Sequence, residues 1–465
     1  MAARRRPASR QGELYTRSRR PVIAIDENHR YVQMTEELDW TELEELVQAI
    51  RMAKLKSEAG RPPHLRALIG ALVFRATRRM TYRETEDQIR HYAPARYLCA
   101  LTESDWTPDA NTIQDFEQLL GEDGVRRINE YVVKRAVTEG LADPQVMAAD
   151  TTAQEAAIPY PNEMRLMATF VSAIAVGAKH VGAALKGFVA RAGELFQKAK
   201  RKLREFRLFG KNKAKAVRMR MTAQMADIVA GVQSKLRHAL SFVDERRLWL
   251  RGFRKVAWSR LNRLRLTMET LLPQIRYWIR TGWVAANKIV NLQIPELYAI
   301  VRGKIGKEVE FGLNWGIRRL RGGFLLATLA KDKRELHDSR YATRAVRDHI
   351  TLFGKAPRAY AYDRGGWSSA NVAEVKRLGV RDVGLAPQGQ ARWLVAGAVK
   401  DRLISERAQV EAGIGAIKSG KYGFSRPAAK SAATMGAAGQ RAVLGFNLNK
   451  LIRALAERQA VELVG

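Results

Sequence analysis

The sequence predicts a mixed α/β fold that is preceded by an all-α domain and interrupted by a long, basic, all-α insertion. Apolar residues recur at helical spacing before residue 143 and again over residues 161–300. Short apolar or alternating runs, typical of strands, lie on either side of the insertion and alternate with helical patterns after it. The chain therefore divides into a basic tail (1–34), a helical domain (35–143), a sheet domain (144–160 with 301–465) and the insertion (161–300).

The N-terminal helical domain is delimited by capping and breaking residues. Thr81 and Glu84 have capping-box spacing, and Pro62, Pro63 and Pro108 fall at breaks in the pattern. The expected helices are Thr35–Lys56, His64–Arg79, Thr81–Arg90, Asn111–Leu120 and Gly124–Val137.

The sheet domain is expected to start with one strand before the insertion and to continue after it with alternating strands and helices. This order describes a mixed sheet layered with helices. The expected strands are Val146–Asp150, Glu308–Leu313, Gly323–Leu329, Arg358–Asp363 and Asp382–Ala386, and the expected helices are Ser339–Leu352, Ser369–Leu378, Ser405–Lys418 and Ala433–Glu457.

Charge points to nucleic acid as the partner. The 465 residues include 81 Lys or Arg and 47 Asp or Glu, a net charge of +34, while 46% hydrophobic residues indicate a folded chain. The insertion alone has 28 basic and 8 acidic residues. Its basic clusters alternate with tryptophans, an arrangement that suits phosphate contact and base stacking. These clusters include Lys211, Lys213, Lys215, Arg254 and Lys255. The alternative is that Trp249, Trp258, Trp278 and Trp283 form the core of the insertion.

Several function classes are disfavoured. The single cysteine, Cys99, excludes a disulfide framework and a Cys-rich zinc module, and it fits a reducing, cytoplasmic location. The longest apolar stretch, Leu166–Ala178, is too short to cross a bilayer, so no membrane association is expected. No phosphate-binding Gly-rich motif occurs, which disfavours an ATP-driven motor.

Carboxylates are the strongest catalytic candidates. Asp150 and Asp363 each end an expected strand, where an aspartate either caps the following turn or points into a site. An expected helix has Arg407, Glu411 and Lys418 on one face. Either this face is simply solvated, or Glu411 is a metal ligand while the side chains of Arg407 and Lys418 bind phosphates. Two Mg²⁺ ions, which prefer carboxylate oxygens, would suit phosphodiester cleavage by such a cluster; Mn²⁺ is a possible substitute.

These residues resemble the DDE transposases of bacterial insertion sequences, whose catalytic domain is RNase H-like. The resemblance rests on Asp150-Thr151-Thr152, on Tyr362-Asp363-Arg364-Gly365-Gly366, and on Arg407, Glu411 and Lys418, which match the spacing of the family's Y-R-E-K signature. It implies an RNase H-like mixed sheet, with Asp150, Asp363 and Glu411 as catalytic metal ligands. Arg407, Lys418 and Arg364 would contact DNA. The signature's tyrosine falls at Ile404, and Trp367 or Trp393 could replace its ring unless both are core residues.

The resemblance also implies a function for the whole chain. A transposase would bind terminal inverted repeats through the helical domain, with Met80–Arg90 and Thr107–Leu120 as candidate contact helices unless they only pack in the bundle. It would cleave element ends and join their 3′-hydroxyls to target DNA, acting as a homodimer on double-stranded DNA near the bacterial nucleoid. Two alternatives remain: a non-catalytic DNA-binding derivative, and a metal-dependent nuclease without strand transfer.

Overall fold

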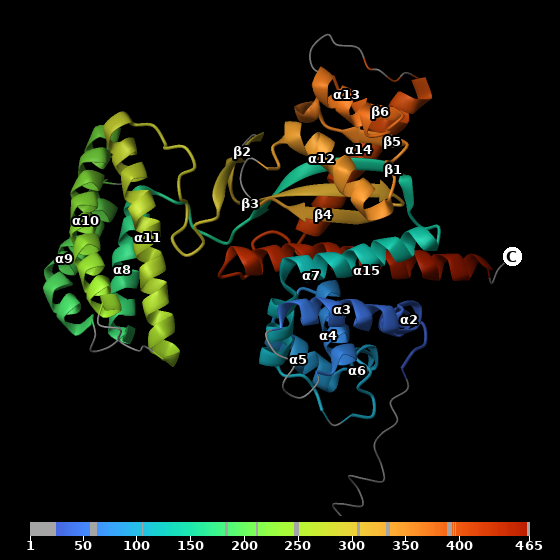
Figure 1. Ribbon diagram of the computed structural model, residues 1–465, viewed down its shortest axis with the longest axis horizontal. Coiled ribbons are helices and arrows are strands. Elements are labelled where there is room, and N and C mark those ends of the chain that lie inside the picture. Colours follow the sequence, from blue (N-terminus) through green and yellow to red (C-terminus); the bar gives the residue numbers. More distant parts are fainter. Residues whose placement is uncertain are drawn as a thin grey trace, which may run out of the picture. The chain divides into compact units, whose positions relative to one another are not determined.

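The computed structural model describes residues 25–462 except 56–62, 105, 182–184, 211–212, 246–250, 305–306, 332–334, 388–392, 394 and 396. The architecture is mixed α/β (Figure 1). The chain divides into two compact units, which are described separately: Met1–Leu120 with Leu444–Gly465, and Gly121–Val443.

The first unit is helical. Thr35–Lys56, expected as one helix, forms two, because Asp39 caps the second by accepting from the Glu42 amide. The capping box is present: Thr81 Oγ1 accepts from the Glu84 amide and the Glu84 carboxylate accepts from the Thr81 amide. The unit contains α2 (Arg30–Glu37), α3 (Trp40–Lys54), α4 (Leu65–Thr77), α5 (Tyr82–His91), α6 (Ala93–Leu98), and the parts of α7 (Ala110–Thr138) and α15 (Ala432–Glu462) within its bounds.

Residues 444–465, which we assigned to the sheet domain, group with the N-terminal helices instead. Gly445 permits this packing, since a Cβ there would lie 1.8 Å from the Ala76 carbonyl oxygen of α4. A buried ion pair between Arg75 and Glu117 joins α4 to α7. In α7 the non-helical Gly121, with φ of 62°, separates the two helices expected there.

The second unit contains a six-stranded sheet. Its order is β2-β3-β1-β5-β6, with β4 also paired to β3. Strand β1 is antiparallel to β3 and parallel to β5, and β5 is parallel to β6. The strands are β1 (Asp143–Glu155), β2 (Tyr298–Lys304), β3 (Lys307–Arg321), β4 (Leu325–Leu329), β5 (Ala359–Tyr362) and β6 (Asp382–Leu385). Strand β2, which pairs with β3, was not expected. Strands β1 and β3 are much longer than expected, because they pair with each other as far as Glu155 although the insertion separates them in the sequence.

Helices cover both faces of this sheet. Tyr341 of α12 (Asp338–Phe353) packs on Gly316 of β3, where a Cβ would lie 2.1 Å from its ring. On the other face, Leu403 of α14 (Gly397–Lys418) packs on Gly384 of β6. Helix α13 (Ser369–Arg377) and the short turn η3 (Arg364–Gly366) complete the connection between β5 and β6.

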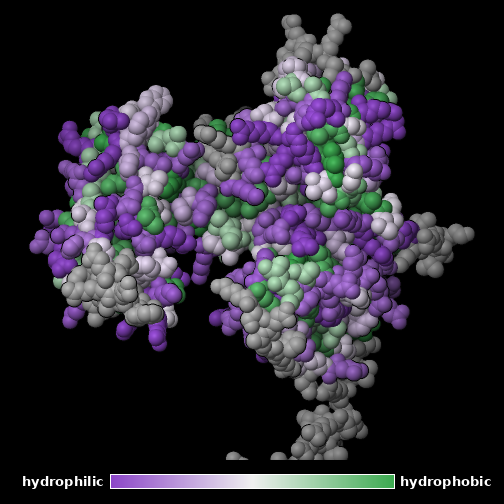
Figure 2. Space-filling model, in the orientation of Figure 1, coloured by the Kyte–Doolittle hydropathy of each residue, from purple (hydrophilic) through white to green (hydrophobic). Residues whose placement is uncertain are grey.

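The described residues of the insertion form four helices around a core of their own. These are α8 (Glu163–Val181), α9 (Lys186–Glu205) with the turn η2 (Phe206–Gly210), α10 (Lys215–Glu245) and α11 (Gly252–Thr281). Phe170, Phe188, Met225 and Leu271 are among the buried residues of one apolar cluster. Hydrophilic residues dominate the visible surface, and apolar residues appear there in small groups (Figure 2). In the described part of the chain, no helix is long and apolar enough to cross a membrane.

Candidate functional site

Asp150 lies inside β1 and not at its end, which corrects the expected strand boundary. The strand continues for five residues to Glu155, paired with β3 throughout, and Asp150 pairs with Ile317. Its Oδ1 accepts a hydrogen bond of 2.7 Å from the Thr151 amide. Because no turn follows Asp150, the turn-capping alternative does not apply to it.

Asp363 directly follows β5 and opens the η3 turn. The parallel ladder of β1 and β5 ends with the pair of Ala148 and Ala361, so Asp150 and Asp363 each follow the last pair by two residues. The side chain of Asp363 makes no cap hydrogen bond to the turn. Instead, Oδ1 accepts a hydrogen bond of 2.5 Å from Nη1 of Arg407.

Helix α14 contributes the third carboxylate and the cation beside it. Glu411 and Arg407 are one turn apart, with Glu411 Oε1 3.8 Å from Arg407 Nη2. The side chain of Glu411 is 61% exposed and that of Asp363 is 46% exposed. A single guanidinium therefore contacts both carboxylates.

The sheet directs Asp150 toward the same face as α14. Directly paired residues on neighbouring strands point to one face, and the face alternates along each strand. Ala148 pairs with Arg319, whose guanidinium contacts Glu406 of α14. Asp150, two residues beyond Ala148, therefore points to the α14 face as well. Among the described residues, however, no three His, Cys, Asp or Glu side chains meet as a group able to hold a metal ion.

A buried ion pair that sequence reasoning missed holds α14 on the sheet. Arg319 Nη1 donates to Glu406 Oε2 at 2.6 Å, and Arg321 Nε donates to Glu406 Oε1 at 3.1 Å. Arg319 also donates to Gln409. Burial lowers the pKa of Arg319 against the opposing effect of Glu406. Glu406, the residue immediately before Arg407, thus anchors the helix that carries Arg407 and Glu411.

Buried tyrosines lie on the other face of the sheet, which α12 covers. Burial, with the nearby charge of Asp150 among the smaller causes, raises the pKa of Tyr360 and of Tyr362, which precedes Asp363. Their hydroxyl groups and that of Tyr341 have no hydrogen-bond partner in the described structure. Their raised pKa values keep these phenols neutral at ordinary pH. Tyr362 also packs against the turn after Asp363, where a Cβ on Gly366 would lie 2.3 Å from its ring.

The remaining predicted DNA contacts occupy separate places. Arg364 is exposed in η3, and Lys418 is the last residue of α14. Lys213 is exposed, whereas Lys215 donates to the Gly282 carbonyl oxygen at 3.1 Å and so links two insertion helices. Lys211 lies outside the described residues, and Arg254 and Lys255 are exposed in the first turn of α11.

The aromatic candidates differ in burial. Trp258 packs against the insertion core, Trp278 is partly buried and Trp283 is 75% exposed. Trp249 lies outside the described residues. At the position of the signature's tyrosine, Ile404 is 44% exposed on α14. Trp367 and Trp393 are partly buried, and Lys400 lies 5.8 Å from the Trp393 ring centroid.

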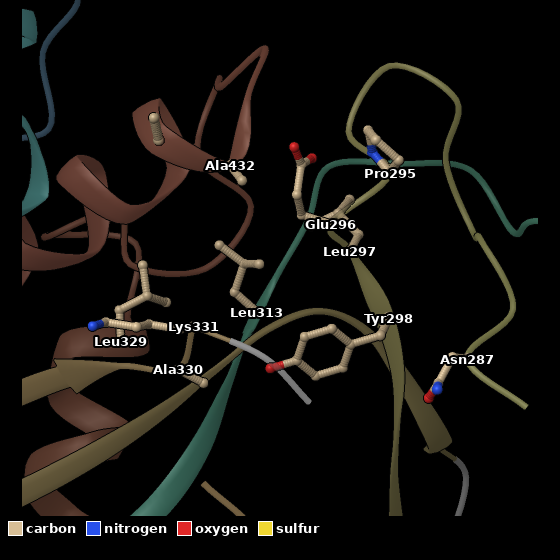
Figure 3. Close-up of a pocket in the computed structure, with 11 residues that line it drawn as sticks. Asn287, Pro295, Glu296, Leu297, Tyr298, Leu313, Leu329, Ala330, Lys331 and Ala432 are labelled. Carbon is tan, nitrogen blue, oxygen red and sulfur yellow. The ribbon is translucent and has the colours of Figure 1, made fainter. Parts of the chain in front are cut away.

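Two cavities lie away from these residues. One, of about 730 Å³, is lined by Tyr298, Leu313 and Leu329 of the sheet and by neighbouring segments (Figure 3). The other, of about 620 Å³, lies in the insertion between α8 and the end of α9. Neither is lined by any predicted site residue.

Comparison with protein families finds one match. The model of a transposase domain (DUF772) matches residues 22–119, most of the first helical unit. The comparisons with curated proteins and with solved structures found no match. The family match supports a transposase, and it falls on the part of the chain that lacks the three candidate carboxylates.

Proposed function

We propose that this chain is a DDE transposase, in which an RNase H-like sheet domain cleaves DNA at the element ends and joins the 3′-hydroxyls to target DNA. The observation that carries the proposal is that Asp150, Asp363 and Glu411 share one face of the sheet domain, with Arg407 in contact with both Asp363 and Glu411. The three carboxylates come from β1, from the end of the parallel neighbour β5 and from α14, and all three are on the α14 face. The sheet order, with an antiparallel β3-β1 pair followed by parallel β5 and β6, supports the RNase H-like interpretation.

The ligand type suits divalent cations, although the three carboxylates do not form a closed cluster in the described structure. Three carboxylates offer the hard oxygen ligands that Mg²⁺ or Mn²⁺ prefers, and Asp150, Asp363 and Glu411 would hold two such ions. When bound, the ions would activate the attacking oxygen and stabilise the leaving oxygen of the phosphodiester. Arg407 contacts one oxygen of each of Asp363 and Glu411, and a carboxylate that accepts from an arginine through one oxygen can still bind a cation through the other.

The chain's own cations would bind and orient DNA. Arg407 lies one turn from Glu411, and its guanidinium could donate two parallel hydrogen bonds to a phosphate. Arg364 and Lys418 would add contacts on either side. In the insertion, the exposed Lys213, Arg254 and Lys255 would bind the backbone independently of sequence.

The helical unit that matches the transposase domain would recognise the element ends. Helix α5 buries Thr85 and Ile89 and leaves most of its other residues at least partly exposed, so this face is available to DNA. Two ends must be brought together, and a homodimer on double-stranded DNA would achieve this.

The test uses purified chain, Mg²⁺ and a labelled duplex carrying the inverted repeats that flank the coding region. We expect cleavage at the repeat boundary and a joined product with target DNA. Asp363→Asn and Glu411→Gln should abolish cleavage and retain DNA binding. Glu374→Gln is the matched control, because Glu374 of α13 is a carboxylate paired with Arg347 of α12 and Arg377 of α13, away from the α14 face.

Other outcomes would contradict the proposal. Full cleavage by either site variant would exclude the metal assignment. Binding of the repeats without cleavage would identify a non-catalytic DNA-binding protein, and cleavage without joining would identify a nuclease.

A further inference from the structure

The ladder between β1 and β5 does not reach the turn that carries Asp363, although β5 stays paired with β6 as far as Tyr362. The pairing of β1 with β5 ends at Ala148 and Ala361, two residues before Asp150 and Asp363. Strand β1 continues to Glu155 along β3, whereas β5 stops at Tyr362. No backbone pairing therefore links Asp363 directly to β1, and side-chain contacts between the two segments help to set the position of Asp363 relative to Asp150.

Asp338, the first residue of α12, spans this gap. Its Oδ1 accepts a hydrogen bond of 2.5 Å from Oγ1 of Thr151, the residue after Asp150. Its Oδ2 lies 2.9 Å from where a Cβ of Gly365 would be, so the carboxylate packs directly on the turn after Asp363. One side chain thus touches the immediate neighbourhood of both candidate ligands.

Asn371 of α13 reinforces the same contact. Its Nδ2 donates to the Ser339 carbonyl oxygen at 2.7 Å and to the Gly366 carbonyl oxygen at 2.8 Å. The Asn371 amide in turn donates to Oγ of Ser368, which caps α13. Two side chains, Asp338 of α12 and Asn371 of α13, therefore connect the first turn of α12 to the η3 turn.

Close packing leaves the turn little freedom. A Cβ at Gly366 would lie 2.3 Å from the ring of Tyr362 and 2.8 Å from Cβ of Ala342. Only a glycine fits there, and the turn rests on α12 at atomic contact. Because the turn is closely packed, a displacement of Asp338 should also displace the backbone that carries Asp363.

We propose that Asp338 is a positioning residue that fixes the separation of Asp150 and Asp363; this role rests on the function proposed above. Asp338 acts from the opposite face of the sheet. Thr151 pairs with Gly316, on which Tyr341 of α12 packs, so Thr151 points to the α12 face while Asp150 points to the α14 face. Asp338 therefore acts through Thr151 and Gly365 and does not itself contact DNA.

The test compares variants that break this contact with variants that keep it. Thr151→Val removes the donor at nearly constant volume, and Asp338→Ala removes the acceptor. Thr151→Ser and Asp338→Asn retain the donor and the acceptor. Thr328→Val is the matched control, since Thr328 of β4 donates to Asp348 of the same helix α12, at 3.2 Å, far along the helix from the turn.

Each variant is measured for single-turnover cleavage of the labelled repeat duplex, for DNA affinity and for the Mg²⁺ concentration that gives half-maximal rate. We expect Thr151→Val and Asp338→Ala to cleave roughly 10²-fold more slowly, the loss typical of a misplacement near 1 Å. They should also need more Mg²⁺ and bind DNA within about twofold of wild type. Thr151→Ser, Asp338→Asn and Thr328→Val should stay close to wild type in all three measurements.

Asp363→Asn in the same assay separates the two proposals. If wild type cleaves and Asp363→Asn does not, then wild-type rates and Mg²⁺ dependence in Thr151→Val and Asp338→Ala overturn the positioning role alone. An equal loss in Thr328→Val would also overturn it, because the effect would then be general destabilisation. If wild type does not cleave, both proposals fail. Should Asp338→Ala not fold, Gly365→Ala tests the contact from the other side, and we expect it to show the same slow cleavage.

Discussion

The buried pair of Arg319 and Glu406 makes a strong prediction about what holds α14 on the sheet. Their side chains are only 10% and 8% exposed, and their closest atoms are 2.6 Å apart. Glu406→Gln keeps the shape of the side chain but leaves Arg319 buried without a carboxylate. Removing one partner of a buried pair costs about 3–5 kcal/mol. The second contact of Glu406, with the 40% exposed Arg321, is screened by solvent and adds less than about 1 kcal/mol.

For the second unit, Gly121–Val443, that cost corresponds to a fall in Tm of about 4–7 °C. Scanning calorimetry of Glu406→Gln, monitored beside wild type, measures it. Glu374→Gln serves as the control for loss of an exposed pair and should leave Tm unchanged. A double variant, Arg319→Met with Glu406→Leu, should recover most of the loss, because an apolar pair needs no charge compensation.

Two results would refute this reasoning. A Tm of Glu406→Gln within about 1 °C of wild type would mean that the pair is solvated. A double variant no more stable than Glu406→Gln would mean that packing, and not an uncompensated charge, causes the loss. If the prediction holds, Glu406→Gln should also slow DNA cleavage, since Arg407 follows it on the same helix.

Three further predictions concern buried groups. Burial and the charge of Arg318 lower the pKa of His349 to about 3, so between pH 7 and pH 5 only the unfolded imidazole gains a proton. The free energy of unfolding should therefore drop by about 2 kcal/mol over this range because of His349. Urea titrations in which His349→Phe shows the same drop as wild type would contradict this. Burial raises the pKa of the Cys99 thiol to about 12, so iodoacetamide at pH 8 should label it only after unfolding, and rapid labelling of the native chain would disprove its burial. Gly316→Ala would force its Cβ to within 2.1 Å of Tyr341 and should cost about 1–3 kcal/mol in urea unfolding, whereas an unchanged midpoint would show that α12 can shift freely.

The sequence by itself determined most of the elements and the composition of the candidate site. Apolar spacing predicted the helices because each must bury one face, and helical geometry alone places Arg407, Glu411 and Lys418 on one face of α14. The capping box at Thr81 could be predicted because it depends only on residues three apart. Such features are local, so neighbouring residues suffice to specify them.

Boundaries that depend on distant partners were predicted less well. Asp150 was expected at the end of a strand, but β3, contributed from beyond the insertion, pairs with β1 as far as Glu155. Strand β2 was missed for the same reason, since its pairing with β3 and not its own pattern makes it a strand. Strand propensity is weak compared with pairing across a sheet.

Tertiary structure alone decided which side chains meet at the site. Nothing in the sequence joins Arg407 to Asp363, Arg319 to Glu406, or Asp338 to Thr151, because the members of each pair are 44 to 187 residues apart. Their contacts follow from sheet order and register, which turn Asp150 toward α14 and Thr151 toward α12. The residue types of the candidate site can thus be predicted from the sequence, whereas their support and their contacts come from the packing of the sheet between its helices.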